Sequence, residues 1–157
     1  MYKFFTRHIS LVALICMVIL CANGASAGAS PAQRLTYDSF TYNLIDGRVC
    51  GTRYQGISDH VVIPEHLDGY PIASIGDGAF MQYSFVKSVT ILPNTVSIGS
   101  YAFYGCSGLT SVIIPQSVKF IGERAFEGCA NLTLIVAENS YAALYAEENG
   151  IPYIFAS

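Results

Sequence analysis

The apolar positions of this chain recur at one long interval instead of the short periods of a single helix or strand. Ile75-Gly76 returns as Ile98-Gly99 and Ile121-Gly122, with a spacing of 23 residues each time. Aligning the three copies gives the pattern I-G-x-x-A-F-x-x-C-x-x-L-x-x-V-x-I. A period of about 20–29 residues that contains L-x-x-V-x-I indicates a solenoid of leucine-rich repeats, whose stacked units bury one continuous core.

Each repeat is predicted to contribute one short strand. Val112 and Ile114 are two residues apart, so both side chains should point into the stack, while Ser111 and Ile113 point outward. Pro115 should end the strand because proline cannot donate to a β-ladder. The predicted fold class is therefore a leucine-rich-repeat solenoid, with short parallel strands on one face and turns and short helical segments on the other.

The other columns of the repeat are predicted to fill the coil or to bend it. Phenylalanine should stack on phenylalanine from repeat to repeat, and Gly99 and Gly122 should sit at sharp turns opposite the strands. In the last repeat the same period assigns Ile135 to the interior and leaves Leu134 and Val136 outside.

Both ends of the array carry signals for capping elements, which end units of a solenoid need. At the start, apolar residues alternate from Phe40 to Leu44 before the turn signal Asp46-Gly47, which predicts a β-hairpin. At the finish, Ser140 is a predicted helix N-cap and Gly150 a stop signal. The apolar face expected for that helix consists of Tyr141, Leu144 and Tyr145.

The repeats resemble the Treponema-type leucine-rich repeat of the BspA-like surface-protein family. That family's pattern, IPxSVxxIGxxAFxxCxxLxxV, is met here by IIPQSVKFIGERAFEGCANLTLIV. The resemblance extends from about Phe40 to Phe155 and implies a surface or secreted protein that adheres to host or extracellular-matrix proteins. Tyr83 departs from it, because it stands where the first repeat would carry cysteine.

The first residues have the features of a secretory signal peptide. A basic start with Lys3 and Arg7 precedes an apolar run over 9–21, and Ala25-Ser26-Ala27 fits a cleavage site. An uncleaved membrane anchor is the alternative. We expect a signal peptide at 1–27 and one leucine-rich-repeat domain at 28–157, with a cap at 28–60, repeats at 61–137 and a second cap at 138–157.

Charge and chemistry favour binding over catalysis. The net charge is −3, and loss of Lys3 and Arg7 with the leader makes the remainder more acidic, which disfavours nucleic acid and anionic membranes. Ser58, Asp59 and His60 are adjacent and cannot form a catalytic relay along one strand. We expect no metal and no cofactor, because the histidines and acidic residues lack ligand spacing.

The cysteine column and the outward strand positions complete the expectations. Cys106 and Cys129 are predicted to be free core thiols, because parallel Cα–Cβ vectors suit a disulfide poorly. The leading hypothesis is a secreted or cell-surface protein-binding module without catalytic activity. The alternatives are a self-associating structural unit of a surface layer and, more remotely, an enzyme. The predicted partner-binding face comprises Asp59, His60, Val62, Lys87, Ser88, Thr90, Thr110, Ser111, Ile113, Thr133, Leu134 and Val136.

Overall fold

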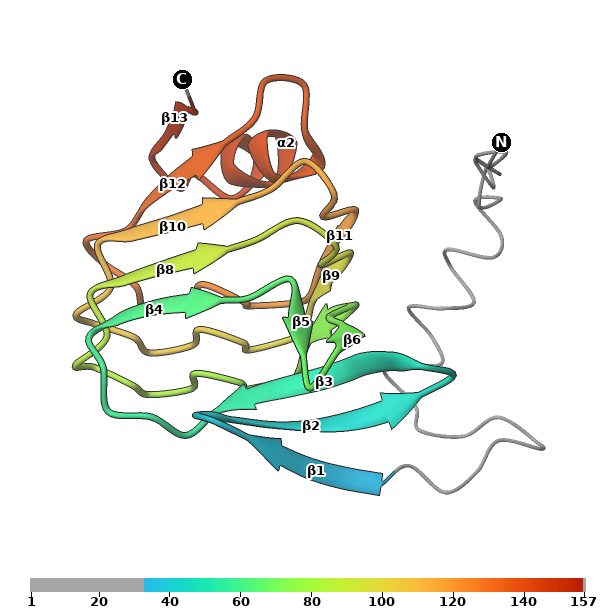
Figure 1. The fold of residues 1–157 in the computed structure, drawn as a ribbon. Coiled ribbons are helices and arrows are strands. Elements are labelled where there is room, and N and C mark those ends of the chain that lie inside the picture. The colour runs from blue at the N-terminus through green and yellow to red at the C-terminus, as the bar shows by residue number, and fades with distance from the viewer. Residues whose placement is uncertain (1–32, 157) are drawn as a thin grey trace, which may run out of the picture.

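The computed structural model describes residues 33–156, and the predicted signal peptide at 1–27 lies outside this range. Successive coils of the chain, which we call rungs, stack along one axis (Figure 1). Their strands form a parallel sheet in the order β13-β12-β10-β8-β4. These strands are β4 (His60–Ile63), β8 (Ser88–Ile91), β10 (Ser111–Ile114), β12 (Thr133–Val136) and β13 (Tyr153–Phe155). The predicted solenoid with parallel strands is confirmed.

The opposite side of the coil carries turns and a second ladder of two-residue strands. Its strands are β7 (Ser74–Ile75), β9 (Ser97–Ile98) and β11 (Phe120–Ile121), which pair in parallel. Within residues 33–156 the structure has one α-helix, α2 (Tyr141–Glu148), so the short helical segments expected on this side are turns. Two-residue strands suffice here because each rung crosses this side briefly before it turns back.

The predicted N-terminal hairpin is confirmed. It consists of β2 (Phe40–Ile45) and β3 (Arg48–Tyr54), which are antiparallel and joined where Asp46 and Gly47 both have positive φ. A strand that the sequence pattern did not predict, β1 (Gln33–Tyr37), pairs with the outer side of β2. A small hairpin of β5 (His66–Leu67) and β6 (Tyr70–Pro71) follows β4.

A column of stacked aromatic rings forms the centre of the core. The ring of Phe103 lies 4.9 Å from Phe80 and 5.1 Å from Phe126, centroid to centroid, with interplanar angles of 14° and 2°. Tyr54 continues the column below Phe80 at 5.2 Å, and Tyr145 of α2 closes it above Phe126 in an edge-on contact at 6.2 Å. The predicted phenylalanine stack is therefore confirmed and is capped at both ends by tyrosine.

The cysteine column ties each rung to the backbone of the rung below. The Cys106 thiol donates to the Phe80 carbonyl at 3.0 Å, and the Cys129 thiol donates to the Phe103 carbonyl at 3.1 Å. Both thiols are free, as predicted. Tyr83 performs the same task in the first repeat, because its hydroxyl donates to the Tyr54 carbonyl at 3.0 Å.

The repeated glycines Gly99 and Gly122 directly precede the turns on the side opposite the strands, as expected. Gly99 and Gly122 have no positive φ, whereas Tyr101 and Arg124, two residues further on, do. A Cβ at Gly122 would lie 2.7 Å from the carbonyl carbon of Gly99 in the preceding rung. Glycine is therefore needed at these positions for close backbone approach between rungs.

The register predicted for the strand of the last repeat, β12, was wrong by one residue. Ser111 pairs with Thr133 and Val112 with Leu134, so this strand begins one residue earlier than the period of 23 requires. Leu134 and Val136 are consequently in the core with 0% exposure, and Ile135 points outward in their place. A shift of one residue exchanges the two faces of a strand.

The C-terminal cap begins as predicted, with the Ser140 hydroxyl accepting from the Ala143 N–H at 3.1 Å. Its buried face, however, consists of Ala142, Ala143 and Ala146, and Leu144 is exposed. Alanine lets the helix backbone lie close to the last rung. Of the three larger side chains expected there, Tyr145 is partly buried and closes the aromatic column, whereas Tyr141 and Leu144 are exposed. No helix within residues 33–156 is long and apolar enough to cross a membrane.

Candidate functional site: the strand face

The outward surface of the parallel sheet presents two parallel rows of side chains. The first row joins one β-branched residue from every strand, since the pairing register aligns them. We call this row the ridge; it consists of Val62, Thr90, Ile113, Ile135 and Ile154. Val62 and Ile154 at its two ends are 57% and 56% exposed, and Ile113 near its middle is 38% exposed.

The second row is polar and lies on the same face, two residues earlier in each strand. It consists of His60, Ser88, Ser111 and Thr133, which are also aligned by the register. Alternate residues of the same strands are buried, as with Val89 and Ile91 in β8. The structure thus brings together a β-branched ridge, apolar except at Thr90, beside a row of hydroxyl groups and one imidazole.

Most of the predicted face residues occupy the expected side of the sheet. Asp59, Lys87 and Thr110 are exposed and directly precede β4, β8 and β10. Backbone bonds hold them in line, from Lys87 N–H to the Asp59 carbonyl at 2.6 Å and from Thr110 N–H to the Lys87 carbonyl at 2.8 Å. The exceptions are Leu134 and Val136, which belong to the core, and the residues that the sequence missed are Ile135 and Ile154.

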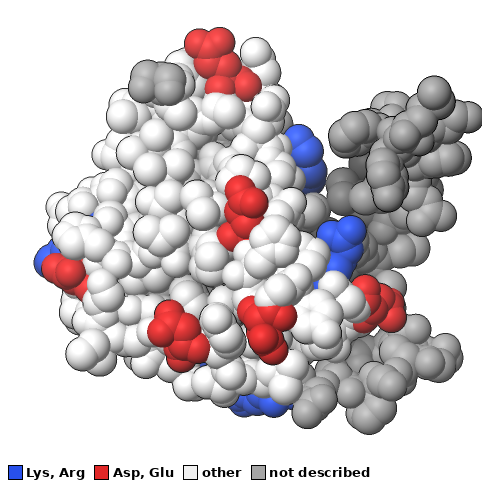
Figure 2. All heavy atoms as spheres, viewed as in Figure 1, with Lys and Arg blue, Asp and Glu red and all other residues white. Residues whose placement is uncertain are grey.

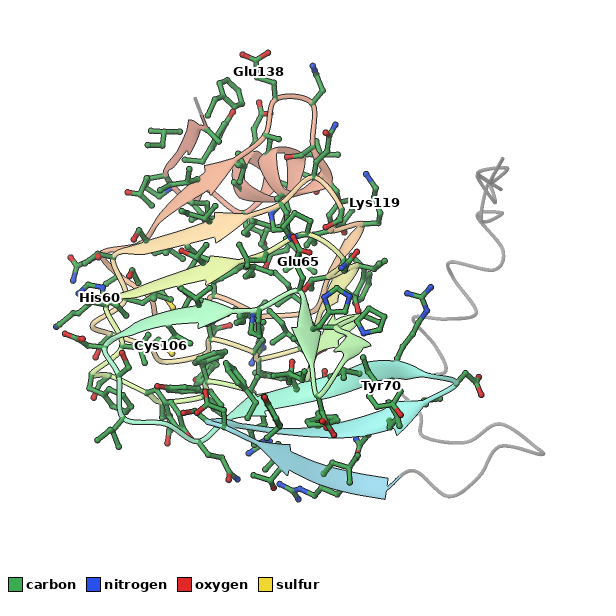
Figure 3. All side chains as sticks on the ribbon, in the orientation of Figure 1. His60, Glu65, Tyr70, Cys106, Lys119 and Glu138 are labelled. Carbon is green, nitrogen blue, oxygen red and sulfur yellow. The ribbon has the colours of Figure 1, made fainter. Side chains whose placement is uncertain are left out.

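A serine and a histidine meet on this face in a way that the sequence did not predict. His60 Nδ1 lies 2.7 Å from the Ser88 hydroxyl, although the two residues are 28 positions apart. Asp59 lies 3.9 Å from His60 Nε2, and these two side chains are 58% and 69% exposed, respectively. Figure 3 shows His60 at the outer end of β4, away from the core.

The exposure of this group decides how it is interpreted. Catalysis by a serine needs a base oriented by a third group, together with preorganised donors for the oxyanion in a site that excludes water. Here water surrounds both Asp59 and His60. We therefore interpret His60 and Ser88 as a cross-strand polar pair that fixes the first two residues of the polar row.

Charge is sparse over the strands. The face above β8, β10 and β12 is white in Figure 2, and the acidic side chains on the viewed side lie singly around it. Figure 3 labels two of them, Glu65 after β4 and Glu138 beside α2. Within residues 33–156, no group of three or more His, Cys, Asp or Glu side chains is arranged to hold a metal ion. The face is thus suited to apolar and hydrogen-bonding contacts.

The thiols lie behind this face and have unequal acidities. The neighbouring Cys129 thiol raises the pKa of Cys106, and burial raises it further. The Cys106 thiol in turn lowers the pKa of Cys129, although partial burial opposes this. Cys106 is labelled in Figure 3, inside the coil. These groups therefore contribute to packing and to hydrogen bonds between rungs, and they do not reach the ridge.

The repeats match a known family model. Residues 70–147 match the family described as BspA-type leucine-rich repeat region, in six copies. This chain is a BspA-type leucine-rich repeat protein. Its repeats therefore belong to the family that the sequence pattern resembles, and the predicted relationship is confirmed. No curated protein matches the chain.

Solved structures of similar proteins share the fold. A leucine-rich cell-surface protein of Faecalibacterium prausnitzii is 36% identical, with a TM-score of 0.60, over 69% of this chain and 31% of that one. A leucine-rich repeat protein of Bacteroides capillosus is 27% identical, with a TM-score of 0.61, over 68% of this chain and 83% of that one. One from Bacteroides ovatus is 26% identical, with a TM-score of 0.56, over 77% of this chain and 33% of that one.

The shares covered differ between these relatives. The matched part of this chain spans about a third of the Faecalibacterium and Bacteroides ovatus proteins but most of the Bacteroides capillosus protein. The same kind of solenoid therefore occurs both as a large part of a chain and as one section of a longer chain.

Proposed function

We propose that this BspA-type repeat protein is a non-catalytic, protein-binding module of the cell surface or the extracellular space, and that the ridge is its contact. The observation that supports this most strongly is the ridge itself. Five β-branched side chains lie in one line outside the core, whereas the alternate residues of β4, β8, β10 and β12 are buried. Apolar residues gathered on an exposed surface commonly mark an interaction site.

The kind of partner follows from the chemistry of the two rows. A ridge rich in methyl groups beside a row of hydroxyl groups, with little charge over the strands, suits the side chains and backbone of another protein. The similarity to a protein named as a cell-surface protein supports a location outside the cell. Host or extracellular-matrix proteins, which the family resemblance implies, are the partners we propose.

The size of the face sets the expected strength of binding. Strands of four residues that lie about 4.8 Å apart give five strands a face of roughly 300–400 Å². A stable interface covers about 800 Å² on each partner. One copy should therefore bind weakly through the ridge alone.

A pair of variants with similar exposure tests the contact. Ile113 and Ile135 are outward, so changing both to Lys should keep the fold and should reduce capture of matrix or host proteins at least tenfold, since buried unpaired charge is heavily penalised. Phe120→Lys is the control, because Phe120 is 42% exposed, close to the 38% of Ile113, but belongs to β11 on the other side. Equal loss in the control, or full capture by the double variant, would refute the ridge as the contact.

The proposed export has its own test. If residues 1–27 form a cleaved leader, the secreted protein should begin at or near Gly28 when its N-terminus is sequenced. An intact Met1 on membrane-bound protein would instead indicate an anchor.

A further inference from the structure

Strand β13 ends the parallel sheet with an unpaired edge. It pairs with β12 on one side, and within residues 33–156 no strand pairs with its other side. The Pro152 carbonyl accepts from Leu134 and the Ala156 N–H donates to Val136, so these groups face β12. Backbone groups alternate in direction along a strand, and therefore the N–H and C=O of Tyr153 and of Phe155 face away from β12.

This edge lacks the features that usually prevent strands from pairing with other chains. Charged side chains, proline and bulges serve that purpose at natural sheet edges. The sequence Tyr153-Ile154-Phe155 contains no charge and no proline, and Pro152, just before it, already directs its carbonyl to β12. Ile154 and Phe155 are both more than half exposed. Figure 1 shows β13 beyond β12 at the end of the stack.

We propose that this edge pairs with β13 of a second copy of the chain, antiparallel and about a two-fold axis at Ile154. Tyr153 of each copy then lies opposite Phe155 of the other. The N–H and C=O groups of Tyr153 in one copy form hydrogen bonds with those of Phe155 in the other, and the reverse. The two Ile154 residues face each other as the non-hydrogen-bonded pair. Tyr153 and Phe155 share the inner side of β13, with ring centroids 5.7 Å apart, so the pairing also creates two aromatic cross-strand contacts.

A second copy fits this edge better than a free peptide does. In each copy, β13 is already held in an extended conformation by its pairing with β12. Neither copy therefore loses the backbone entropy that a free peptide would lose on binding. The two-fold arrangement is self-complementary, because the same residues meet from both sides. The strands involved are short, and we therefore expect a weak dimer that depends on protein concentration.

The dimer would also extend the ridge. Val62, Ile113 and Ile154 of one copy would continue through Ile154 of the other into a single row across a ten-stranded sheet. The face would double to roughly 600–800 Å², which approaches the area of a stable interface. This last consequence rests on the proposed function, whereas the pairing of the edges does not.

The test is analytical ultracentrifugation of the protein as isolated from cells, over about a hundredfold range of protein concentration. The wild type should shift from one copy to two as the concentration rises. Ile154→Lys places like charges at the two-fold axis and should weaken the dimer at least tenfold. Phe155→Pro removes an outward donor without affecting a bond to β12, and it should also weaken the dimer.

The matched control is Val62→Lys. Val62 has the same exposure as Ile154 to within one per cent and lies on the same face, but on β4 at the opposite edge of the sheet. Its dimer should match that of the wild type. A wild type that stays monomeric at the highest concentration would overturn the proposal. So would a dimer that survives both β13 variants, or one that Val62→Lys disrupts.

The two proposals can fail separately. Capture of a partner that is lost in the Ile113 and Ile135 double variant, together with a strictly monomeric protein, would support the ridge and overturn the dimer. A concentration-dependent dimer that captures no partner would support the pairing of the β13 edges and overturn the ridge as a contact for other proteins.

Discussion

Replacing Phe103 by alanine removes the middle of the aromatic column. The ring is fully buried, and it stacks between Phe80 at 4.9 Å and Phe126 at 5.1 Å. The rungs above and below are held at a fixed spacing by their backbone hydrogen bonds. The resulting cavity therefore cannot close without breaking those bonds, so the variant should lose the full contribution of the contacts that the ring makes.

The magnitude follows from the two kinds of contact that are lost. Full burial of a phenylalanine side chain contributes about 1.5–3 kcal/mol, and each stacked aromatic pair adds about 0.5–1.5 kcal/mol. The Phe103 ring takes part in two such pairs, so we expect Phe103→Ala to lower the free energy of unfolding by roughly 4 kcal/mol, within the range of about 3–5 kcal/mol measured for buried phenylalanines. In a domain of this size that corresponds to a fall in Tm of roughly 12–20 °C.

Urea unfolding followed by far-UV circular dichroism measures this change. The midpoint should fall while the slope m stays the same, since the surface exposed on unfolding hardly changes. Phe120→Ala is the control, because the Phe120 side chain is partly exposed on β11, and it should cost less than about 1 kcal/mol. Equal stability of the two variants would refute the claim that the column supports the stack.

Three further predictions concern the register, the spacing of the rungs and the thiols. Leu134→Lys should destabilise the fold by more than about 3 kcal/mol because it buries an unpaired charge, while Ile135→Lys should stay within about 1 kcal/mol, as measured by urea unfolding. Gly122→Ala should cost roughly 1–3 kcal/mol in the same assay, since its Cβ would lie 2.7 Å from backbone of the rung below. A thiol reagent at neutral pH should modify Cys129 before Cys106, because their pKa values are shifted in opposite directions and only Cys106 is fully buried; peptide mass spectrometry would detect the order.

The repeat period was a reliable guide wherever the copies have equal length. It placed the phenylalanine column, the cysteine column and the outward positions of β10 from spacing alone, because stacked rungs force equivalent residues into equivalent environments. Between Leu132 and Val136 the last copy is one residue shorter, and the period then assigned the wrong side chains to the core. The apolar character of Leu134, Ile135 and Val136 gave no means of detecting the slip.

The caps were harder to predict than the repeats. The turn at Asp46-Gly47 and the N-cap at Ser140 have local signals, and both were found. Strand β13 has three residues and no alternation of polar and apolar positions, so only its pairing with β12 defines it. The ridge depends on that pairing as well, and its fifth member, Ile154, could not be placed from the sequence.

The contact between His60 and Ser88 in the polar row could not be predicted from the sequence. His60 and Ser88 are ordinary residues in the sequence and become neighbours only through the register of β4 with β8. A constellation of this kind is found from strand pairing and not from a local motif.

Isoleucine methyl signals in NMR spectra, recorded with and without a captured partner, show whether the ridge is the contact surface. If it is, the signals of Ile113, Ile135 and Ile154 should shift or broaden, with little change at the buried Ile98. Ile57 is an internal control, because it is 95% exposed in the loop before β4 and does not belong to the ridge. Changes confined to Ile57, with the methyl signals of the three ridge isoleucines unaffected, would show that the ridge is not the contact.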